Sequence, residues 1–451
     1  MPDTAAKKLT NLAPEQPRDL IGGHMRSFFR DRTGFLTRQA KLGDVSYVQM
    51  GNQPLYFANH PDLVRDVLVV NADKFIKGRA LQRTKSLLGN GLLTNEGASH
   101  LRQRRMIQPA FHRTRIVEYS RSMVEAAGRM ADTWQDGEVR DIDRDMMRLT
   151  LQIVAKTLFG ADVTDEADRV GHAMTTLVEM FNYLLLPFSE FLEKLPLPHS
   201  IRLKRARRTL DEIVYGFIDE RRRTGEDRGD LLSMLLNARD EEDGSAMTDE
   251  EVRDEVLTLF LAGHETTANA LTWTWMLLSQ NPEAETKLHR EFESVLGGRL
   301  PAMDDIPQLT FTEAVIAESM RLYPPAWAIG RKAIAEHELG GYPIAANAVV
   351  LVSPFVMHRD ARFWDEPLEF RPERWLSLSV KEAGQRNIYF PFGGGVRRCI
   401  GEAFAWTELI LLTATIGSRW KLRLEPDQKI GLDPKITLRP KFGMRMRIKR
   451  A

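Results

Sequence analysis

The sequence has little of several features that would place it in a special class of proteins. It contains a single cysteine, at position 399, in 451 residues. An intramolecular disulfide is therefore excluded, which fits a reducing compartment. No apolar run approaches the ~18 residues that a membrane-spanning helix needs, and the polar residues 1–20 lack the apolar core of a signal peptide. We expect a soluble, cytoplasmic protein without a membrane anchor.

The charge and the composition are balanced. The 63 Lys and Arg residues face 62 Asp and Glu residues, for a net charge of +1, so nucleic-acid binding is not expected. Hydrophobic residues make up 43% of the chain, which is ordinary for a globular protein with a large core. A chain of this length often forms two or three domains, but no Pro/Ser-rich tract, repeat or low-complexity run marks a linker. We therefore expect one domain over residues 1–451.

The single cysteine lies in the sequence FGGGVRRCIG, residues 392–401. An apolar helix is predicted directly after it, over residues 401–412. The sulfur is thus expected at a helix N-terminus, where backbone N–H groups and the helix dipole favour a thiolate. A thiolate is a good axial ligand for haem iron, and its electron donation favours O–O cleavage. By residue type alone, however, a lone cysteine is more often a small buried hydrophobe.

The spacing Phe-x-x-Gly-x-Arg-x-Cys-x-Gly resembles the haem-binding signature of the cytochrome P450 family. Its specified positions are filled here by Phe392, Gly395, Arg397, Cys399 and Gly401. The resemblance covers roughly residues 20–449 and implies the cytochrome P450 fold, which is mainly α with small β-sheets. It also implies haem b as the cofactor, with Cys399 as the ligand of the iron and Phe392 beside the haem.

A long helix is predicted over residues 249–280. Thr248 and Glu251 have the spacing of a capping box at its start, and the Asn-Pro pair at 281–282 ends it. At 1.5 Å per residue the helix would be roughly 48 Å long. Its middle is apolar on nearly every side, which indicates a buried helix.

The centre of this helix nevertheless reads AGHETT, residues 262–267. Polar groups in a buried helix cost stability and therefore indicate a function. The segment resembles the oxygen-activation motif of the cytochrome P450 family. The resemblance implies that Ala262 and Gly263 leave room for dioxygen beside the haem, and that Glu265 and Thr266 deliver protons. From the residues alone, a Thr266 bonded to the carbonyl four residues back and a Glu265 turned to solvent are equally open.

Basic residues are expected to bind the haem propionates. His100 and Arg104 lie four residues apart and so share one helix face, and charge-assisted hydrogen bonds to carboxylates are strong. The resemblance assigns both residues to the propionates, together with Arg331 and Arg397. The alternative for such a basic run is a solvated face.

A second set of charged residues is interpreted as structural. Glu318 and Arg321 lie three residues apart on a helix predicted over 308–323, so their side chains meet. The resemblance adds Arg374 as the third member. Such a buried set must be fully paired, and it would hold the irregular segment 359–392 beneath the haem.

The remaining elements are predicted from alternation and helical periodicity. We expect a helix over 21–43, a hairpin with its turn at Gly51-Asn52, and a second hairpin over 337–357 with its turn at 345–347. The segments 165–186 and 199–224 are expected to form a helix pair that resembles the family's mobile lid over the substrate channel.

Apolar residues at the family's pocket positions are expected to bind the substrate. They are Leu92, Leu93, Phe181, Leu184, Leu261, Ala262, Ala326, Trp327, Ile329 and Phe442. On apolar character alone, such residues are as often ordinary core. An apolar lining favours a fatty acid, a terpenoid, a steroid or another small hydrophobic substrate.

The resemblance implies a monooxygenase that inserts one oxygen atom from O2 into this substrate. No Gly-x-Gly-x-x-Gly segment follows the haem motif, so electrons are expected from a separate acidic ferredoxin or flavodoxin with its NAD(P)H-dependent reductase. Arg102, Arg105 and Arg398 are expected at the surface, where they would steer this partner. A peroxide-driven peroxygenase, a non-enzymatic haem sensor and a helical structural protein without haem are the alternatives.

Overall fold

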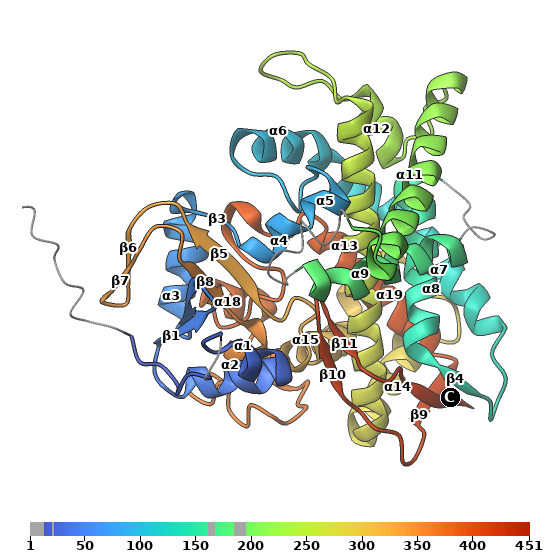
Figure 1. Cartoon of the computed structure of the whole chain (residues 1–451). Coiled ribbons are helices and arrows are strands. Elements are labelled where there is room, and N and C mark those ends of the chain that lie inside the picture. Colours follow the sequence, from blue (N-terminus) through green and yellow to red (C-terminus); the bar gives the residue numbers. More distant parts are fainter. Residues whose placement is uncertain (1–12, 20–21, 161–166, 185–194) are drawn as a thin grey trace, which may run out of the picture. The chain divides into compact units, whose positions relative to one another are not determined.

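The structure is a computed structural model that describes residues 13–19, 22–160, 167–184 and 195–451 (Figure 1). The chain divides into two compact units. The smaller unit comprises Met1–Arg79, Trp327–Leu368 and Lys381–Arg398, and the larger comprises Ala80–Ala326, Glu369–Val380 and Cys399–Ala451. The mainly helical fold with small sheets is confirmed, whereas the single domain over 1–451 stays a prediction.

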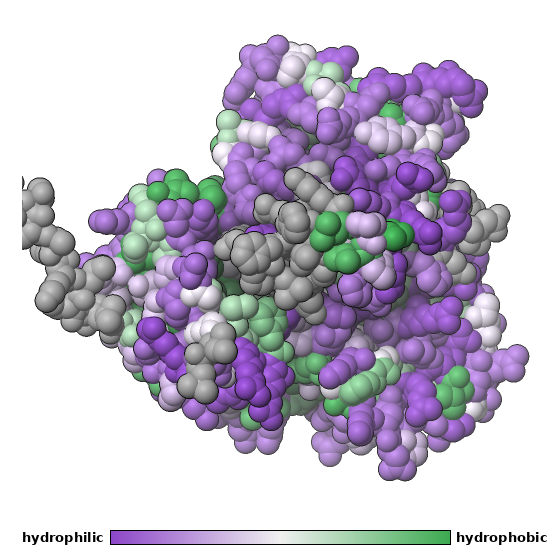
Figure 2. All heavy atoms as spheres, viewed as in Figure 1, coloured by the Kyte–Doolittle hydropathy of each residue, from purple (hydrophilic) through white to green (hydrophobic). Residues whose placement is uncertain are grey.

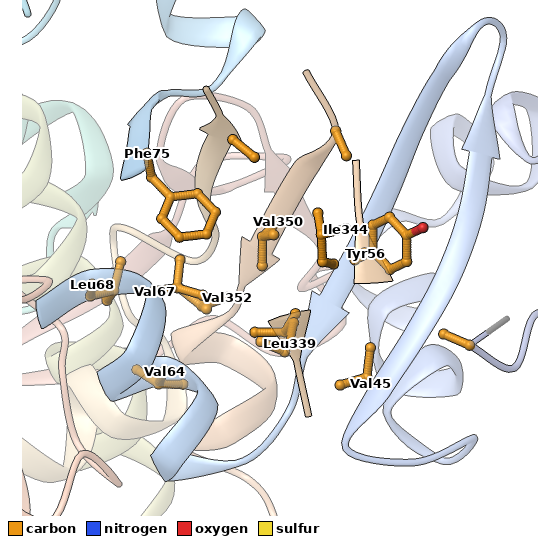
Figure 3. Packing of buried hydrophobic residues seen from close by; sticks show 14 of the residues in the cluster. Val45, Tyr56, Val64, Val67, Leu68, Phe75, Leu339, Ile344, Val350 and Val352 are labelled. Carbon is orange, nitrogen blue, oxygen red and sulfur yellow. The ribbon is translucent and has the colours of Figure 1, made fainter. Parts of the chain in front are cut away.

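The smaller unit is built on a five-stranded sheet with the strand order β1-β2-β8-β5-β3. The strands are β1 (Val45–Met50), β2 (Gln53–Ala58), β3 (Phe75–Lys77), β5 (Ile329–Ala333) and β8 (Val349–Val352). The predicted hairpin at Gly51-Asn52 is present, with Met50 paired to Gln53. Figure 3 shows how Val350 and Val352 of the sheet pack against Val64 and Val67, which come from α3 (Pro61–Arg65) and the following π-helix η1 (Asp66–Val70).

Two predictions for the smaller unit are corrected. The helix expected over 21–43 is two helices, α1 (Met25–Arg30) and α2 (Arg32–Ala40), because Asp31, whose backbone is not helical, caps α2 by accepting from Gly34 N at 3.0 Å.

The second hairpin pairs β6 (His337–Leu339) with β7 (Tyr342–Ile344), so its turn is Gly340-Gly341 and not residues 345–347. Both glycines have positive φ, as a tight two-residue turn requires.

The larger unit holds most of the helices. Their bounds are α4 (Arg79–Arg83), α5 (Lys85–Leu88), α6 (Gly97–Ile107), α7 (Arg113–Asp132), α8 (Ile142–Phe159), α9 (Ala167–Leu184), α11 (Pro198–Thr224), α12 (Leu231–Asn237), α13 (Asp249–Gln280), α14 (Pro282–Leu296), α15 (Thr310–Leu322), α17 (Arg374–Ser377) and α19 (Glu402–Gly417). A three-stranded sheet, β4 (Val139–Asp141), β12 (Arg445–Arg450) and β9 (Trp420–Leu424), and a hairpin, β10 (Leu432–Pro434) and β11 (Leu438–Pro440), complete it.

Helix α13 has the bounds and the capping box that the sequence predicts. Thr248 Oγ1 accepts from Glu251 N at 3.1 Å, and Glu251 Oε2 accepts from Thr248 N at 2.9 Å. The helices α8, α11, α15 and α19 all pack against α13, and α8 runs along it in Figure 1. The apolar middle of α13 is buried by these neighbours.

Helix α11 presents an exposed basic face. Leu203, Ala206 and Leu210 are buried at helical spacing, whereas the basic side chains between them are exposed. Figure 2 shows the resulting hydrophilic surface over α11 and α12. Among the described residues, no helix is both long and apolar enough to cross a membrane.

Candidate active site

At the midpoint of α13, a few residues of this buried helix are accessible to solvent. Every residue from Val252 to Leu278 is buried except Ala262, Gly263 and Thr266, and Ala262 is exposed. Ala262 and Thr266 lie four residues apart and so share one face. The residues singled out by the sequence therefore surround a local opening in the helix packing.

Gly263 serves the packing of α13 rather than this opening. A Cβ atom at Gly263 would lie 2.9 Å from Val154 Cγ2 on α8. Nearby, Thr150 Oγ1 of α8 donates to His264 O at 3.0 Å. Val154 therefore lies directly against Gly263, and the room for dioxygen at Ala262 and Gly263 stays a prediction.

Thr266 and Glu265 differ in their surroundings. Thr266 Oγ1 donates to Ala262 O, four residues back, at 2.6 Å. Glu265 is not turned to solvent, since it is only 2% exposed. Its Oε1 accepts from Thr437 Oγ1 at 2.5 Å and lies 4.0 Å from Arg439 Nε. Its Oε2 is buried without a hydrogen-bond partner among the described residues.

The electrostatics of Glu265 favour a retained proton. Burial raises the pKa of Glu265, and the charge of Arg439 and the bond from Thr437 oppose the rise. The protonated carboxyl therefore persists to a higher pH than on an exposed glutamate. An acid that holds a proton beside Thr266 matches the chemistry expected of a proton donor.

Thr437 was missed by the sequence analysis. It lies in the turn between β10 and β11, and its hydroxyl also accepts from Asn269 Nδ2 of α13 at 3.1 Å. Phe442, the expected last pocket contact, is 56% exposed and packs on Gly431 at the other end of this hairpin. The structure thus brings Thr437 to Glu265, whereas the substrate role of Phe442 stays a prediction. Thr437 meets Glu265 only through the tertiary fold, so no local sequence pattern could have found it.

Cys399 lies two residues before Gly401, the N-cap of α19, so the predicted position of the sulfur at a helix N-terminus is confirmed. Cys399 is exposed, although cysteine is among the most often buried residue types. The aromatic side chain of Phe404 in the first turn of α19 packs edge-on against Phe111 and Tyr119. This packing fixes the start of α19 and hence the place of Cys399.

The glycines before Cys399 belong to the smaller unit. Gly393 and Gly395 have φ values of 72° and 63°, which favour glycine. A Cβ atom at Gly395 would also collide with Leu68 O. Glycine at 395 is therefore required both by its backbone conformation and by the close approach of η1.

The Glu318 network predicted from the sequence is present and complete. Glu318 and Arg321 are both 0% exposed. Glu318 Oε2 accepts from Arg321 Nε at 2.8 Å and from Trp375 Nε1 at 2.9 Å. Glu318 Oε1 accepts from Arg374 Nε and from Arg371 N, both at 2.9 Å. The network ties residues 369–375 to α15.

Comparison with known proteins agrees with these features. The family described as Cytochrome P450 matches residues 31–444. The chain belongs to the cytochrome P450 family. Cyclooctatin synthase of Streptomyces melanosporofaciens is 40% identical over 93% of this chain and 91% of its own length. Cyclooctat-9-en-7-ol 5-monooxygenase of the same species is 40% identical, over 90% and 88%. Pentalenene oxygenase of Streptomyces avermitilis is 38% identical, over 91% of each chain.

The larger unit of this P450 fits the haem iron cofactor of its family. In a P450 the haem iron takes a thiolate ligand and needs open space on its oxygen-binding side. Cys399 offers an exposed sulfur, and Ala262 offers an exposed small residue in a helix that is otherwise buried. The residues present therefore fit haem, and Cys399 is the residue that would ligate its iron.

The other predicted haem contacts are found on both units of the P450. His100 and Arg104 stand on α6 of the larger unit, with His100 2% exposed. Arg331, 9% exposed, Phe392 and Arg397 belong to the smaller unit. Their haem and propionate contacts stay predictions.

Two arginines of α6 that were expected at the surface, Arg102 and Arg105, form ion pairs. The Arg102 side chain is 21% exposed, and its Nη1 donates to Glu251 Oε1 at 3.0 Å. Arg105 Nη2 lies 3.0 Å from Glu242 Oε1. Their charges are paired within the larger unit, and their role in steering a redox partner stays a prediction.

The expected pocket residues show a range of exposure. Leu92, Leu261 and Trp327 are buried, whereas Leu93, Ala326 and Ile329 are partly exposed. The side chains of Phe181 and Leu184, and the segment between α9 and α11 expected in the lid, lie outside the described residues. The substrate role of all these residues stays a prediction.

A buried acid on α19 was also missed. Glu408 is 0% exposed, and neither carboxyl oxygen has a hydrogen-bond partner among the described residues. Burial raises the pKa of Glu408 to about 8, although the Thr267 hydroxyl on α13 acts to lower this pKa. The signal that could have found it is an acid in a helix that is otherwise apolar all round.

Proposed function

We propose that this P450 hydroxylates a hydrophobic terpenoid and that its cofactor is haem b. The opening at Ala262, flanked by Thr266 and the buried acid Glu265, is the observation that carries the monooxygenase chemistry. The names of two relatives refer to pentalenene and to cyclooctat-9-en-7-ol. Those substrates support a hydrophobic alkene or alcohol of the terpenoid class here.

In this mechanism, bound haem supplies the activation of O2 and the insertion of one oxygen atom into a C–H bond. Cys399 would ligate the iron from its position just before the N-terminus of α19. Ala262 keeps the space at the midpoint of α13 open. Glu265 holds a proton in a buried carboxyl group that Thr437 orients, and the Thr266 hydroxyl passes this proton on toward the opening. His100, Arg104, Arg331 and Arg397 would bind the propionates of this haem.

The partner and the location are part of the same proposal. Electrons come from a separate acidic ferredoxin or flavodoxin with its NAD(P)H-dependent reductase, and the exposed Arg398 beside Cys399 contributes to its docking. A cytoplasmic location is supported by the single cysteine, which must stay reduced to bind iron.

The experiment that tests the proton step replaces Thr266 with valine, which keeps the shape and removes the hydroxyl. We expect the product formed per NAD(P)H to fall about 10-fold or more, since a positioned proton donor contributes at least that much. Hydrogen peroxide release should rise in its place. The measurement is the ratio of product to NAD(P)H with pentalenene in a reconstituted system.

Thr272→Val is the matched control. Thr272 stands on α13, is buried, and makes the same bond to the carbonyl four residues back, at 2.8 Å to Ala268 O. It lies away from the opening, so its loss should leave the coupling unchanged. A fully coupled Thr266→Val enzyme would contradict the proposed role, and turnover with peroxide alone would favour a peroxygenase.

A further inference from the structure

Two adjacent acids in the first half of α13 bind the backbone of the segment 89–95. Asp254 Oδ2 accepts from Asn90 N at 2.6 Å, and Glu255 Oε2 accepts from Leu92 N at 3.0 Å. Glu255 is 0% exposed and Asp254 5%. Burying a carboxylate lowers the stability of the fold unless the group is paired. These hydrogen bonds are therefore a specific structural feature and not a chance surface contact.

The segment 89–95 approaches α13 as closely as its backbone allows. A Cβ atom at Gly89 would collide with the Asp254 carboxylate. A Cβ atom at Gly91 would collide with Thr258 Oγ1 and would lie 2.6 Å from Asp254 O. The two glycines thus let the segment lie directly on the helix, over Asp254 and Thr258.

The face of α13 that carries Glu255 also carries the opening at the midpoint of the helix. Glu255, Ala262 and Thr266 are seven and eleven residues apart, close to two and three full turns of a helix with 3.6 residues per turn. They therefore share one face. The segment 89–95 covers this face as far as Thr258, and the face becomes exposed one turn later, at Ala262.

Resting on the proposed function, we propose that Glu255 is a specificity-determining positioning residue. By holding Leu92 N, it sets where Leu92 and Leu93 stand at the covered end of the opening, and so which substrates fit beside Ala262. A charge-assisted hydrogen bond to a backbone N–H is stronger than a neutral one. Such a bond suits a segment that must keep its position when the substrate binds.

Neighbouring hydrogen bonds also hold the segment 89–95 in place. Arg253 Nη1 donates to Asp254 Oδ1 at 2.7 Å, and Arg253 Nε donates to Asp211 of α11 at 2.8 Å. Arg207 Nη1 of α11 donates to Ser86 O, just before the segment, at 2.8 Å. Because α11 also forms hydrogen bonds to Ser86 and Arg253, we expect that Glu255 can be replaced without detaching the segment 89–95 from α13.

The test compares Glu255→Met, which removes the acceptor at similar length, with Glu255→Gln, which keeps an oxygen for Leu92 N. Glu250→Met is the control, because Glu250 is exposed on the same helix. The first measurement is the amide exchange of residues 89–95 in the haem-loaded proteins. The second is the dissociation constant for pentalenene and for cyclooctat-9-en-7-ol, from the high-spin shift of the haem spectrum.

For Glu255→Met we expect amide exchange at Leu92 to accelerate about 10-fold or more, because the buried N–H loses its acceptor. The dissociation constants should rise by a similar factor, and the mixture of products should broaden. Glu255→Gln and Glu250→Met should resemble the wild type. Wild-type exchange and wild-type affinity in Glu255→Met would overturn the proposal.

Two further outcomes keep the inference separate from the proposed function. If Glu255→Met does not bind haem, Gly91→Ala displaces the segment with the acid intact, and unchanged dissociation constants in that variant would overturn the proposal. If the wild type binds neither terpenoid, the substrate class of the proposed function fails. The amide exchange at Leu92 then still decides whether Glu255 positions the segment.

Discussion

At the scale of single residues, burial raises the pKa of two acids of the larger unit, Glu265 and Glu408, and their neighbours differ. Glu265 has a hydroxyl and a guanidinium beside it, which limit the rise of its pKa. Both oxygens of Glu408 lack a hydrogen-bond partner among the described residues, and burial raises its pKa to about 8. The neighbours of Glu265 thus oppose the effect of burial on its pKa, whereas the ionisation of Glu408 is expected to weaken the fold.

Glu408→Gln is expected to change how stability depends on pH. Between the ordinary glutamate pKa of about 4.3 and about 8, the folded state holds a proton that the unfolded state has released. Wild-type stability should therefore fall as pH rises through this window. The glutamine variant lacks this loss, so it should be the more stable protein at about pH 8, by a few kcal/mol, and similar to the wild type at about pH 5.

Urea unfolding of the two haem-loaded proteins at both pH values measures this difference. Glu250→Gln, at an exposed position of α13, controls for the loss of one carboxyl group. A Glu408→Gln protein that is less stable than the wild type at both pH values would show that Glu408 is ionised and paired in the folded state.

Which residues could be predicted depended on whether their signal is local. Cys399 with its glycines, and the Glu265-Thr266 pair, are read from spacing within a few residues. Thr437 reaches Glu265 from 172 residues away, and Asn90 reaches Asp254 from 164 residues away. Such contacts follow from the packing of the whole unit, so neighbouring sequence carries no trace of them.

At the scale of elements, α13 could be predicted almost to the residue, because its cap and its apolar positions are local. The helix expected over 21–43 was less accessible. Its periodicity continues through Asp31, and only the hydrogen bond to Gly34 N shows that a new helix begins there. The hairpin turn was misplaced for a related reason, since two turn-like segments, 340–341 and 345–347, lie close together.

The Glu318 network gives a prediction for the element α15. Glu318→Ala would leave Arg321, Arg374 and the indole of Trp375 without their shared acceptor in a buried site, which is strongly destabilising, by roughly 3–5 kcal/mol. We expect the variant to lose haem incorporation rather than turnover per haem. The measurement is the ratio of haem to protein after purification.

Glu313→Ala is the control for this experiment, because Glu313 is exposed on the same helix. It should keep its haem. A stable, haem-loaded Glu318→Ala protein with slow turnover would instead place Glu318 in the reaction.

At the scale of the whole molecule, membership of the cytochrome P450 family and the chemistry of α13 support the same function. The family match covers residues 31–444, and so includes both Cys399 and the opening at Ala262. A buried acid and a hydroxyl beside that opening fit an enzyme that needs protons to use O2. Neither feature would be needed by a haem sensor.

The most direct test of this account is turnover of a terpenoid under isotopically labelled dioxygen, with NAD(P)H, a ferredoxin and its reductase. Pentalenene and cyclooctat-9-en-7-ol are the first substrates to use. The account predicts a hydroxylated product that carries one labelled oxygen atom, formed only when the reductase system is present. A product whose oxygen comes from water or from added peroxide, or no product with a haem-loaded enzyme, would contradict it.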